Sequence, residues 1–110
     1  MFFGSFRRYQ NIKPSEAQEK LKQPNTILLD VRMPEEYARN HIPGSILIPL
    51  DELGQRVKSK IPDPNTAIIV YCQSGGRSSR AADQLSKLGY NEIFNLGGIN
   101  SWPYKTQSGR

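Results

Sequence analysis

The fold is decided by residues 66–77, which read TAIIVYCQSGGR. The first six form an uninterrupted apolar or β-branched run, which predicts a buried central strand. Cys72, the only cysteine, follows directly, and a glycine-containing loop then leads into a pattern with helical spacing. Backbone N–H groups at a helix N-terminus favour negative charge and lower a cysteine pKa from its free value of about 8.5. We therefore take Cys72 as the leading candidate for a nucleophile.

The loop after Cys72 contains the residue types that an ionised thiol and an anion require. Gly75 and Gly76 let the backbone curl so that several N–H groups face the sulfur. Arg77 adds a positive charge and a planar fork suited to an oxyanion. A lone cysteine is often only a small buried hydrophobic residue. The presence of Ser74, two glycines and an arginine directly after Cys72 favours a catalytic role over a structural one. A monothiol redox motif is the other interpretation, and it leaves Arg77 without a role.

Strand-like and helix-like stretches alternate along the rest of the chain, which is typical of α/β units around a parallel sheet. We expect strands at 9–12, 26–29, 45–48, 66–71 and 92–96, helices at 14–22, 34–39, 50–61 and 78–88, and a short last helix before Pro103. Ser78 or Ser79 is the expected cap of the fourth long helix, and Gly89 its terminator. Ligands bind outside the carboxyl ends of parallel strands, where Asp30 and Cys72 both fall.

Length and composition limit the possible organisation. The 110 residues fit one domain, which we expect at 9–104, with a flexible lead-in at 1–8 and a polar, frayed tail at 105–110. One cysteine and one histidine exclude a disulfide framework and a multi-cysteine zinc site. We therefore expect neither a metal nor a cofactor.

Charge and hydropathy limit the possible partners. The formal net charge is +5, but the basic residues are scattered and are not interleaved with aromatic residues as in a nucleic-acid stacking platform. No segment approaches the length of a membrane span. We expect a cytoplasmic protein that binds neither nucleic acid nor membrane, with a small anion as its partner, and a reduced cysteine suits that compartment.

Four motifs carry a resemblance to a known family. Residues 72–78 resemble the active-site loop of the rhodanese sulfurtransferases. The other three resemble further signatures of that family, in the family's order, and are Asp30-Val31-Arg32 with Glu36-Tyr37, His41-Ile42-Pro43-Gly44-Ser45, and Leu96-Gly97-Gly98-Ile99 with Trp102. The resemblance covers about residues 9–104.

This resemblance implies a three-layer α/β domain, in which helices flank both faces of a five-stranded parallel sheet. It also implies a mechanism in which the Cys72 thiolate attacks the sulfane sulfur of a donor such as thiosulfate, releases sulfite and becomes a persulfide. A thiol, cyanide or a protein partner would then accept the sulfur. The implied substrate-binding residues are Gln73, Ser74, Gly75, Gly76, Arg77 and Ser78, with backbone N–H groups on the persulfide and Arg77 on the anionic donor.

Asp30 and Arg32 are possible supporting residues. We expect Asp30 to orient Arg32 or a loop amide as part of the scaffold. Arg32 could assist with the anionic donor, and a structural ion pair is an equal interpretation. His41 lies beside a turn, and we expect it to fix that turn by hydrogen bonding rather than to act as a base.

Two alternatives to a thiosulfate sulfurtransferase follow from the same motifs. One is a sulfur-relay or regulatory module that exchanges sulfur with a protein partner. The other is a cysteine phosphatase or arsenate reductase, which would have five residues between its cysteine and arginine. Here only four residues separate Cys72 from Arg77, and Ser78 stands where a phosphatase would have arginine. The loop length therefore favours sulfur transfer.

Overall fold

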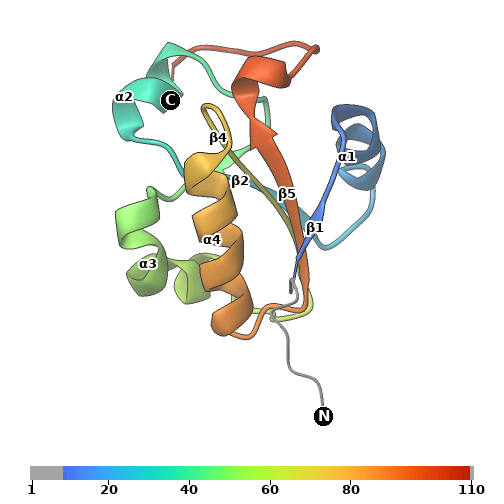
Figure 1. Ribbon diagram of the computed structural model, residues 1–110, viewed down its shortest axis with the longest axis vertical. Coiled ribbons are helices and arrows are strands. Elements are labelled where there is room, and N and C mark those ends of the chain that lie inside the picture. The colour runs from blue at the N-terminus through green and yellow to red at the C-terminus, as the bar shows by residue number, and fades with distance from the viewer. Residues whose placement is uncertain (1–8, 110) are drawn as a thin grey trace.

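The computed structural model describes residues 9–109, so the expected lead-in at 1–8 lies outside the described residues. Five strands form one sheet in the order β1-β5-β4-β2-β3, and every neighbouring pair is parallel (Figure 1). The strands are β1 (Gln10–Asn11), β2 (Thr26–Asp30), β3 (Ile46–Leu47), β4 (Ala67–Cys72) and β5 (Glu92–Gly98). All five overlap the predicted stretches, although β2, β4 and β5 end one or two residues later than predicted, and β4 is central and fully buried.

Helices cover both faces of the sheet. They are α1 (Pro14–Lys20), α2 (Pro34–Arg39), α3 (Leu53–Lys60) and α4 (Gly76–Lys87), with the 3-10 turns η1 (Leu50–Glu52) and η2 (Ile99–Ser101). Figure 1 shows α1 on one side of the strands and α3 and α4 together on the other. The predicted three-layer α/β domain with a five-stranded parallel sheet is confirmed. No helix among residues 9–109 is both long and apolar enough to cross a membrane.

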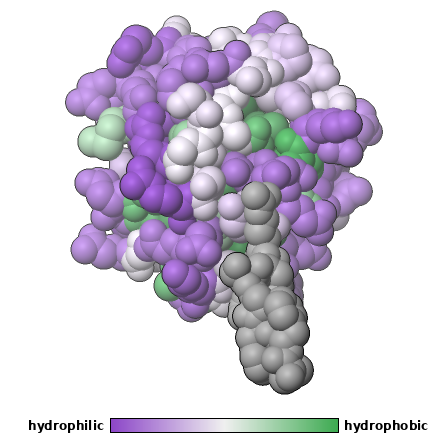
Figure 2. Space-filling model, in the orientation of Figure 1, coloured by the Kyte–Doolittle hydropathy of each residue, from purple (hydrophilic) through white to green (hydrophobic). Residues whose placement is uncertain are grey.

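The core is divided between the two faces by the alternation of side chains along β4. Ile68, Val70 and Cys72 belong to the apolar cluster that includes the buried residues of α3 and α4. Ile69 and Tyr71 belong to the opposite cluster, with Ala17 of α1. The surface in Figure 2 is largely hydrophilic, with small and separate apolar areas. Cys72 therefore directs its side chain toward the face on which α4 begins.

The start of α4 differs from the prediction. The helix begins at Gly76, and Gly75 is its N-cap with φ 115° in the left-handed region. Neither Ser78 nor Ser79 caps it, because both lie inside the helix and the Ser78 hydroxyl donates to the Gly75 carbonyl at 3.0 Å. A glycine tolerates this φ without strain, so the chain enters the helix two residues earlier than the apolar pattern indicates. The predicted terminator is confirmed: Gly89, with φ 100°, follows the C-cap Leu88.

The described part of the tail, which we expected to be frayed, makes backbone bonds to the end of α2 and to His41. Gln107 and His41 form an antiparallel bridge in which each N–H donates to the other's carbonyl, at 2.8 and 2.9 Å. The Gly109 N–H donates to the Ala38 carbonyl of α2 at 2.7 Å. The tail thus provides partners for the His41 backbone groups and for the Ala38 carbonyl in the last turn of α2. Polar composition did not reveal this pairing, since it depends on backbone groups.

The end of β5 approaches the loop after Cys72 very closely. The register between β4 and β5 shifts after Val70, which leaves Leu96 as an extra residue and places Gly98 opposite Cys72. A Cβ on Gly98 would overlap the Gln73 carbonyl and lie 2.6 Å from the Cα of Ser74. Only glycine allows this approach, so β5 fixes the path of the loop.

We predict that Gly98→Ala lowers the free energy of unfolding by about 1–3 kcal/mol, because the added methyl group must displace the loop backbone. Gly76→Ala is the matched control, since a Cβ there meets no atom within 4 Å and its position is helical. The control should change stability by less than about 1 kcal/mol. Urea unfolding of both variants checks this, and equal stabilities would contradict the close approach.

Candidate functional site

The sulfur of Cys72 lies inside a cradle of backbone N–H groups. Cys72 is the last residue of β4 and only 1% of its surface is exposed. Its Sγ accepts hydrogen bonds from the amide of Gly75 at 3.0 Å and from the amide of Ser78 at 3.3 Å. The left-handed turn at Gly75 brings the first amides of α4 back toward the end of the strand. The loop therefore presents donors to a sulfur that carries negative charge.

The surroundings lower the pKa of the Cys72 thiol from its ordinary value. Burial has the largest single influence and raises the pKa, but hydrogen bonds from Ser78, Gly75 and Ser74 together outweigh it. The Ser78 hydroxyl has only one proton, and it also lies within reach of the carbonyls of Gly75 and Gly97, at 3.0 and 3.3 Å. The backbone amides are consequently the donors that always face the sulfur, and they stabilise the thiolate.

Arg32 holds the other side of the loop through a buried ion pair. The side chains of Asp30 and Arg32 are both fully buried and meet at 2.8 Å. Both carboxylate oxygens of Asp30 accept from the guanidinium, and one also accepts from the Arg32 amide. Two other guanidinium N–H groups donate to Gln73 Oε1 at 3.0 Å and to the Asn40 carbonyl at 2.6 Å. The ion pair, one of the two interpretations of Arg32, is thus present in the structure.

Gln73 is clamped from both sides. Its amide oxygen accepts from Arg32, while its amide nitrogen donates to Asn100 Oδ1 at 2.7 Å. The Gln73 carbonyl also accepts from the Asn100 amide at 3.2 Å. The first residue of the loop is thus fixed to Arg32, just after β2, and to η2, which leaves its backbone N–H as the part that can face a ligand.

Arg77 is paired with Glu36, a residue that sequence reasoning did not place in the site. The two guanidinium nitrogens donate one to each oxygen of the Glu36 carboxylate, at 2.7 and 2.9 Å. The hydrogen bonds from Arg77 are the main reason that the pKa of Glu36 is lowered to about 2, against the opposing effect of burial. The expected free cation of Arg77 is therefore balanced by a carboxylate. The position of Glu36 after the strand that neighbours β4 was the signal that could have indicated this pair.

His41 is bound within the contact between α2 and the tail. Its ring stacks on Tyr37 with centroids 3.8 Å apart, and Nδ1 lies 2.9 Å from the Tyr37 carbonyl. Its Nε2 lies 3.1 Å from the side-chain amide of Gln107. Both ring nitrogens are engaged at the turn, in agreement with the predicted turn-fixing role.

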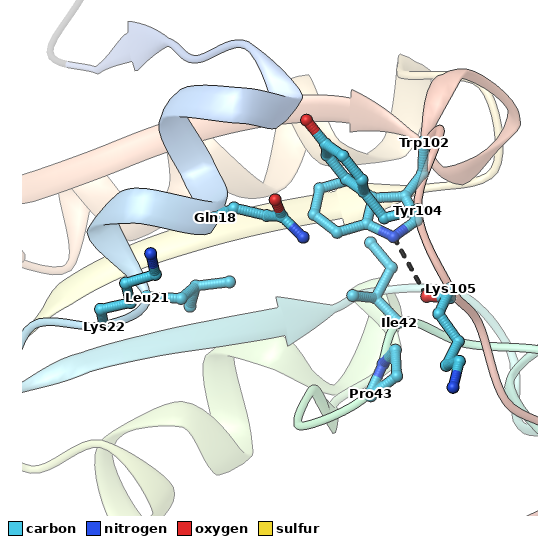
Figure 3. Close-up of a pocket in the computed structure, with 8 residues that line it drawn as sticks. All are labelled: Gln18, Leu21, Lys22, Ile42, Pro43, Trp102, Tyr104 and Lys105. Carbon is cyan, nitrogen blue, oxygen red and sulfur yellow. Dashed lines mark hydrogen bonds between the residues drawn. The ribbon is translucent and has the colours of Figure 1, made fainter.

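A separate hollow of about 320 Å³ lies between α1 and the segment that follows η2 (Figure 3). Leu21, Ile42, Pro43 and Trp102 line it, and the Trp102 indole donates to the Lys105 carbonyl at 3.3 Å. None of residues 72–78 lines this hollow. The site around Cys72 is thus a cradle at the end of the sheet and does not include this hollow.

Comparison with known proteins connects this geometry to a family. The family model described as "Rhodanese-like domain" matches residues 13–104. The chain is 42% identical over 71 residues to "Thiosulfate sulfurtransferase PspE" of Escherichia coli (strain K12), which covers 64% of this chain and 68% of that protein. It is 40% identical over 81 residues to "Putative sulfur carrier protein YrkF" of Bacillus subtilis (strain 168), covering 73% of this chain but only 43% of that protein.

A solved structure shows the same likeness. The structure titled "rhodanese with anions from E. coli" superposes with a TM-score of 0.72 at 37% sequence identity, and covers 76% of this chain and 99% of that one. The family match spans all four of the motifs that carry the resemblance. The chain belongs to the rhodanese-like domain family.

Proposed function

We propose that the protein is a sulfurtransferase, which moves a sulfane sulfur from thiosulfate or a similar donor to a thiol or cyanide through a persulfide on Cys72. The observation that carries this proposal is the pair of amide hydrogen bonds on the Cys72 sulfur at the start of α4. The similarity to a thiosulfate sulfurtransferase supports the choice of donor.

The reaction has two displacement steps. The Cys72 thiolate attacks the outer sulfur of thiosulfate, the S–S bond of the donor breaks, and sulfite leaves with the electron pair. The product is a persulfide anion on Cys72. The acceptor then attacks the terminal sulfur, and the Cys72 thiolate leaves with the electron pair of the S–S bond. The amides that hold the thiolate can also hold the charge that returns to Cys72 in the second step.

Each remaining loop residue has a proposed role. The amides of Gln73, Ser74, Gly75, Gly76 and Ser78 form the cradle, and Arg77 binds the anionic part of the donor. Asp30 and Arg32 act as positioning residues, since they fix Gln73. The mechanism requires a reduced Cys72, and the cytosol, which the composition favours, keeps thiols in that state.

A sulfur-relay role is the second candidate. In this role a protein persulfide would be the donor or a protein thiol the acceptor, and thiosulfate would be used slowly. The ion pair between Arg77 and Glu36 favours this role. Because Glu36 neutralises the Arg77 guanidinium, that guanidinium is not free to bind a small dianion such as thiosulfate. The similarity to a putative sulfur carrier points the same way.

Incubation with thiosulfate should add one sulfur atom to the wild-type protein, because the persulfide is the stable product of the first step. Cys72→Ser should add none. Intact-mass measurement before and after addition of cyanide checks both, since cyanide should remove the added sulfur. The persulfide mechanism fails if the wild type gains nothing or if both proteins gain equally.

The pH dependence of alkylation should report the lowered pKa of Cys72. Only the thiolate reacts, so the rate with uncharged iodoacetamide rises through the pKa and then levels off. We expect the midpoint to lie below that of a free peptide of residues 70–79. Ser78→Ala should move the midpoint upward, because it removes the hydroxyl and keeps the amide. A midpoint at or above that of the peptide would contradict thiolate stabilisation by the loop.

Arg77→Ala should lower kcat/KM for thiosulfate by about tenfold, the usual effect of losing a charged hydrogen bond. Its rate with iodoacetamide should change by less than about threefold, because the amides around the sulfur remain. Arg80→Ala is the matched control, since Arg80 lies exposed on the same helix and loses the same charge. Equal losses in both reactions would mean that Arg77 acts on Cys72 and not on the donor.

A further inference from the structure

Both guanidinium groups that adjoin the loop after Cys72 are bound to carboxylates. Arg32 binds Asp30, and Arg77 binds Glu36. These four side chains carry no net charge together, although the whole chain has a formal charge of +5. The net positive charge of the chain therefore does not come from these four side chains beside the loop.

The two ion pairs differ in how readily they can exchange partners. Asp30 and Arg32 are fully buried, so their separation would leave two unpaired charges inside the protein. Arg77 and Glu36 remain 30% and 22% exposed, so solvent can hydrate either partner when the pair opens. Arg77 is the guanidinium that a ligand can reach, and Glu36 already occupies both arms of its fork.

We propose that Glu36 is a specificity-determining residue, which weakens the use of dianionic sulfur donors relative to donors that carry less charge. This inference rests on the proposed sulfurtransferase function. A doubly charged donor such as thiosulfate must compete with the Glu36 carboxylate for Arg77 and is repelled by it. An organic thiosulfonate carries a single charge, and a persulfide donor can approach without occupying the fork. The site is thus better suited to organic sulfur donors than a free Arg77 would make it.

The carboxylate is present at every pH at which the enzyme would act. The hydrogen bonds from Arg77 lower the pKa of Glu36 to about 2, so the group is ionised throughout the neutral range. The other charged groups that act on Glu36 or Arg77 are Arg32, Asp30 and the Cys72 thiolate. Discrimination by Glu36 should therefore depend on donor charge and not on pH near neutrality.

Glu36→Gln is a suitable variant because the rest of α2 can keep its structure. Glu36 Oε1 also accepts from the Met33 amide at 2.8 Å, which closes the first turn of the helix. A glutamine oxygen can accept the same bond. Glu35→Gln is the matched control, since Glu35 is the adjacent, exposed residue of the same helix and loses the same charge. Glu36→Asp keeps the charge and serves as the rescue variant.

The first experiment measures charge at the thiol without any sulfur transfer. The rate of Cys72 alkylation is measured with anionic iodoacetate and with neutral iodoacetamide. The rate with iodoacetate divided by the rate with iodoacetamide is then compared between variants. Glu36→Gln should raise the ratio at least about fivefold, because one unit charge on the order of 8 Å away near a protein surface changes a rate by up to about thirtyfold before salt screens it. Glu35→Gln and Glu36→Asp should stay within about twofold of the wild type. Equal ratios in Glu36→Gln and Glu35→Gln would overturn the proposal.

The second experiment compares donors. The ratio of kcat/KM for thiosulfate to that for methanethiosulfonate should rise several-fold in Glu36→Gln, remain unchanged in Glu35→Gln and return toward the wild-type value in Glu36→Asp. A merely structural role would change both donors equally and would overturn the proposal. If the wild type transfers sulfur from neither donor, the proposed function fails, and the alkylation ratio still decides whether Glu36 controls charge at the thiol.

Discussion

Asp30 and Arg32 form the buried ion pair around which the end of the sheet is organised. The Arg32 guanidinium joins three parts of the chain, because it bonds Asp30 of β2, the Gln73 side chain in the loop and the Asn40 carbonyl after α2. It also lies over the Tyr71 ring at 5.6 Å. Loss of one partner from a buried pair costs about 3–5 kcal/mol, so this group constrains all three segments at once. The loop that follows Cys72 is thus held from the end of β2 through Arg32 as well as from β5 through Gly98.

The site divides its work between backbone and side chains. The backbone amides of the loop stabilise negative charge on sulfur, and truncation of a loop side chain does not remove them. The side chains around them either fix the loop, as Arg32 does, or balance charge, as Glu36 does. Under the proposed function, the same cradle would serve different donors when the balancing residue changes, with the same chemistry at Cys72.

The sequence predicted what depends on local pattern. The strands followed from apolar runs, and the cradle around Cys72 followed from a loop whose decisive contacts join residues at most six positions apart. The start of α4 was misplaced because the left-handed Gly75 is a stronger signal than the two serines after it. Contacts between distant residues were missed. Arg77 and Glu36 are 41 positions apart, and no periodicity links them. The bridge from the tail to His41 uses backbone atoms, which composition does not describe.

The attachment of the tail has a consequence for motion near the site. Helix α2 is held by the bond from Arg32 to Asn40, by the bond from Gly109 to Ala38 and by the bridge between His41 and Gln107. A helix fixed at its end in this way cannot swing as a hinged segment to open the site. Separation of Glu36 from Arg77 is then left to rotation of the two side chains. Such rotations occur in picoseconds to nanoseconds at exposed positions, whereas movement of a segment takes microseconds or longer. In the proposed reaction, exchange of the carboxylate for a donor would thus require the opening of two hydrogen bonds but no movement of a helix.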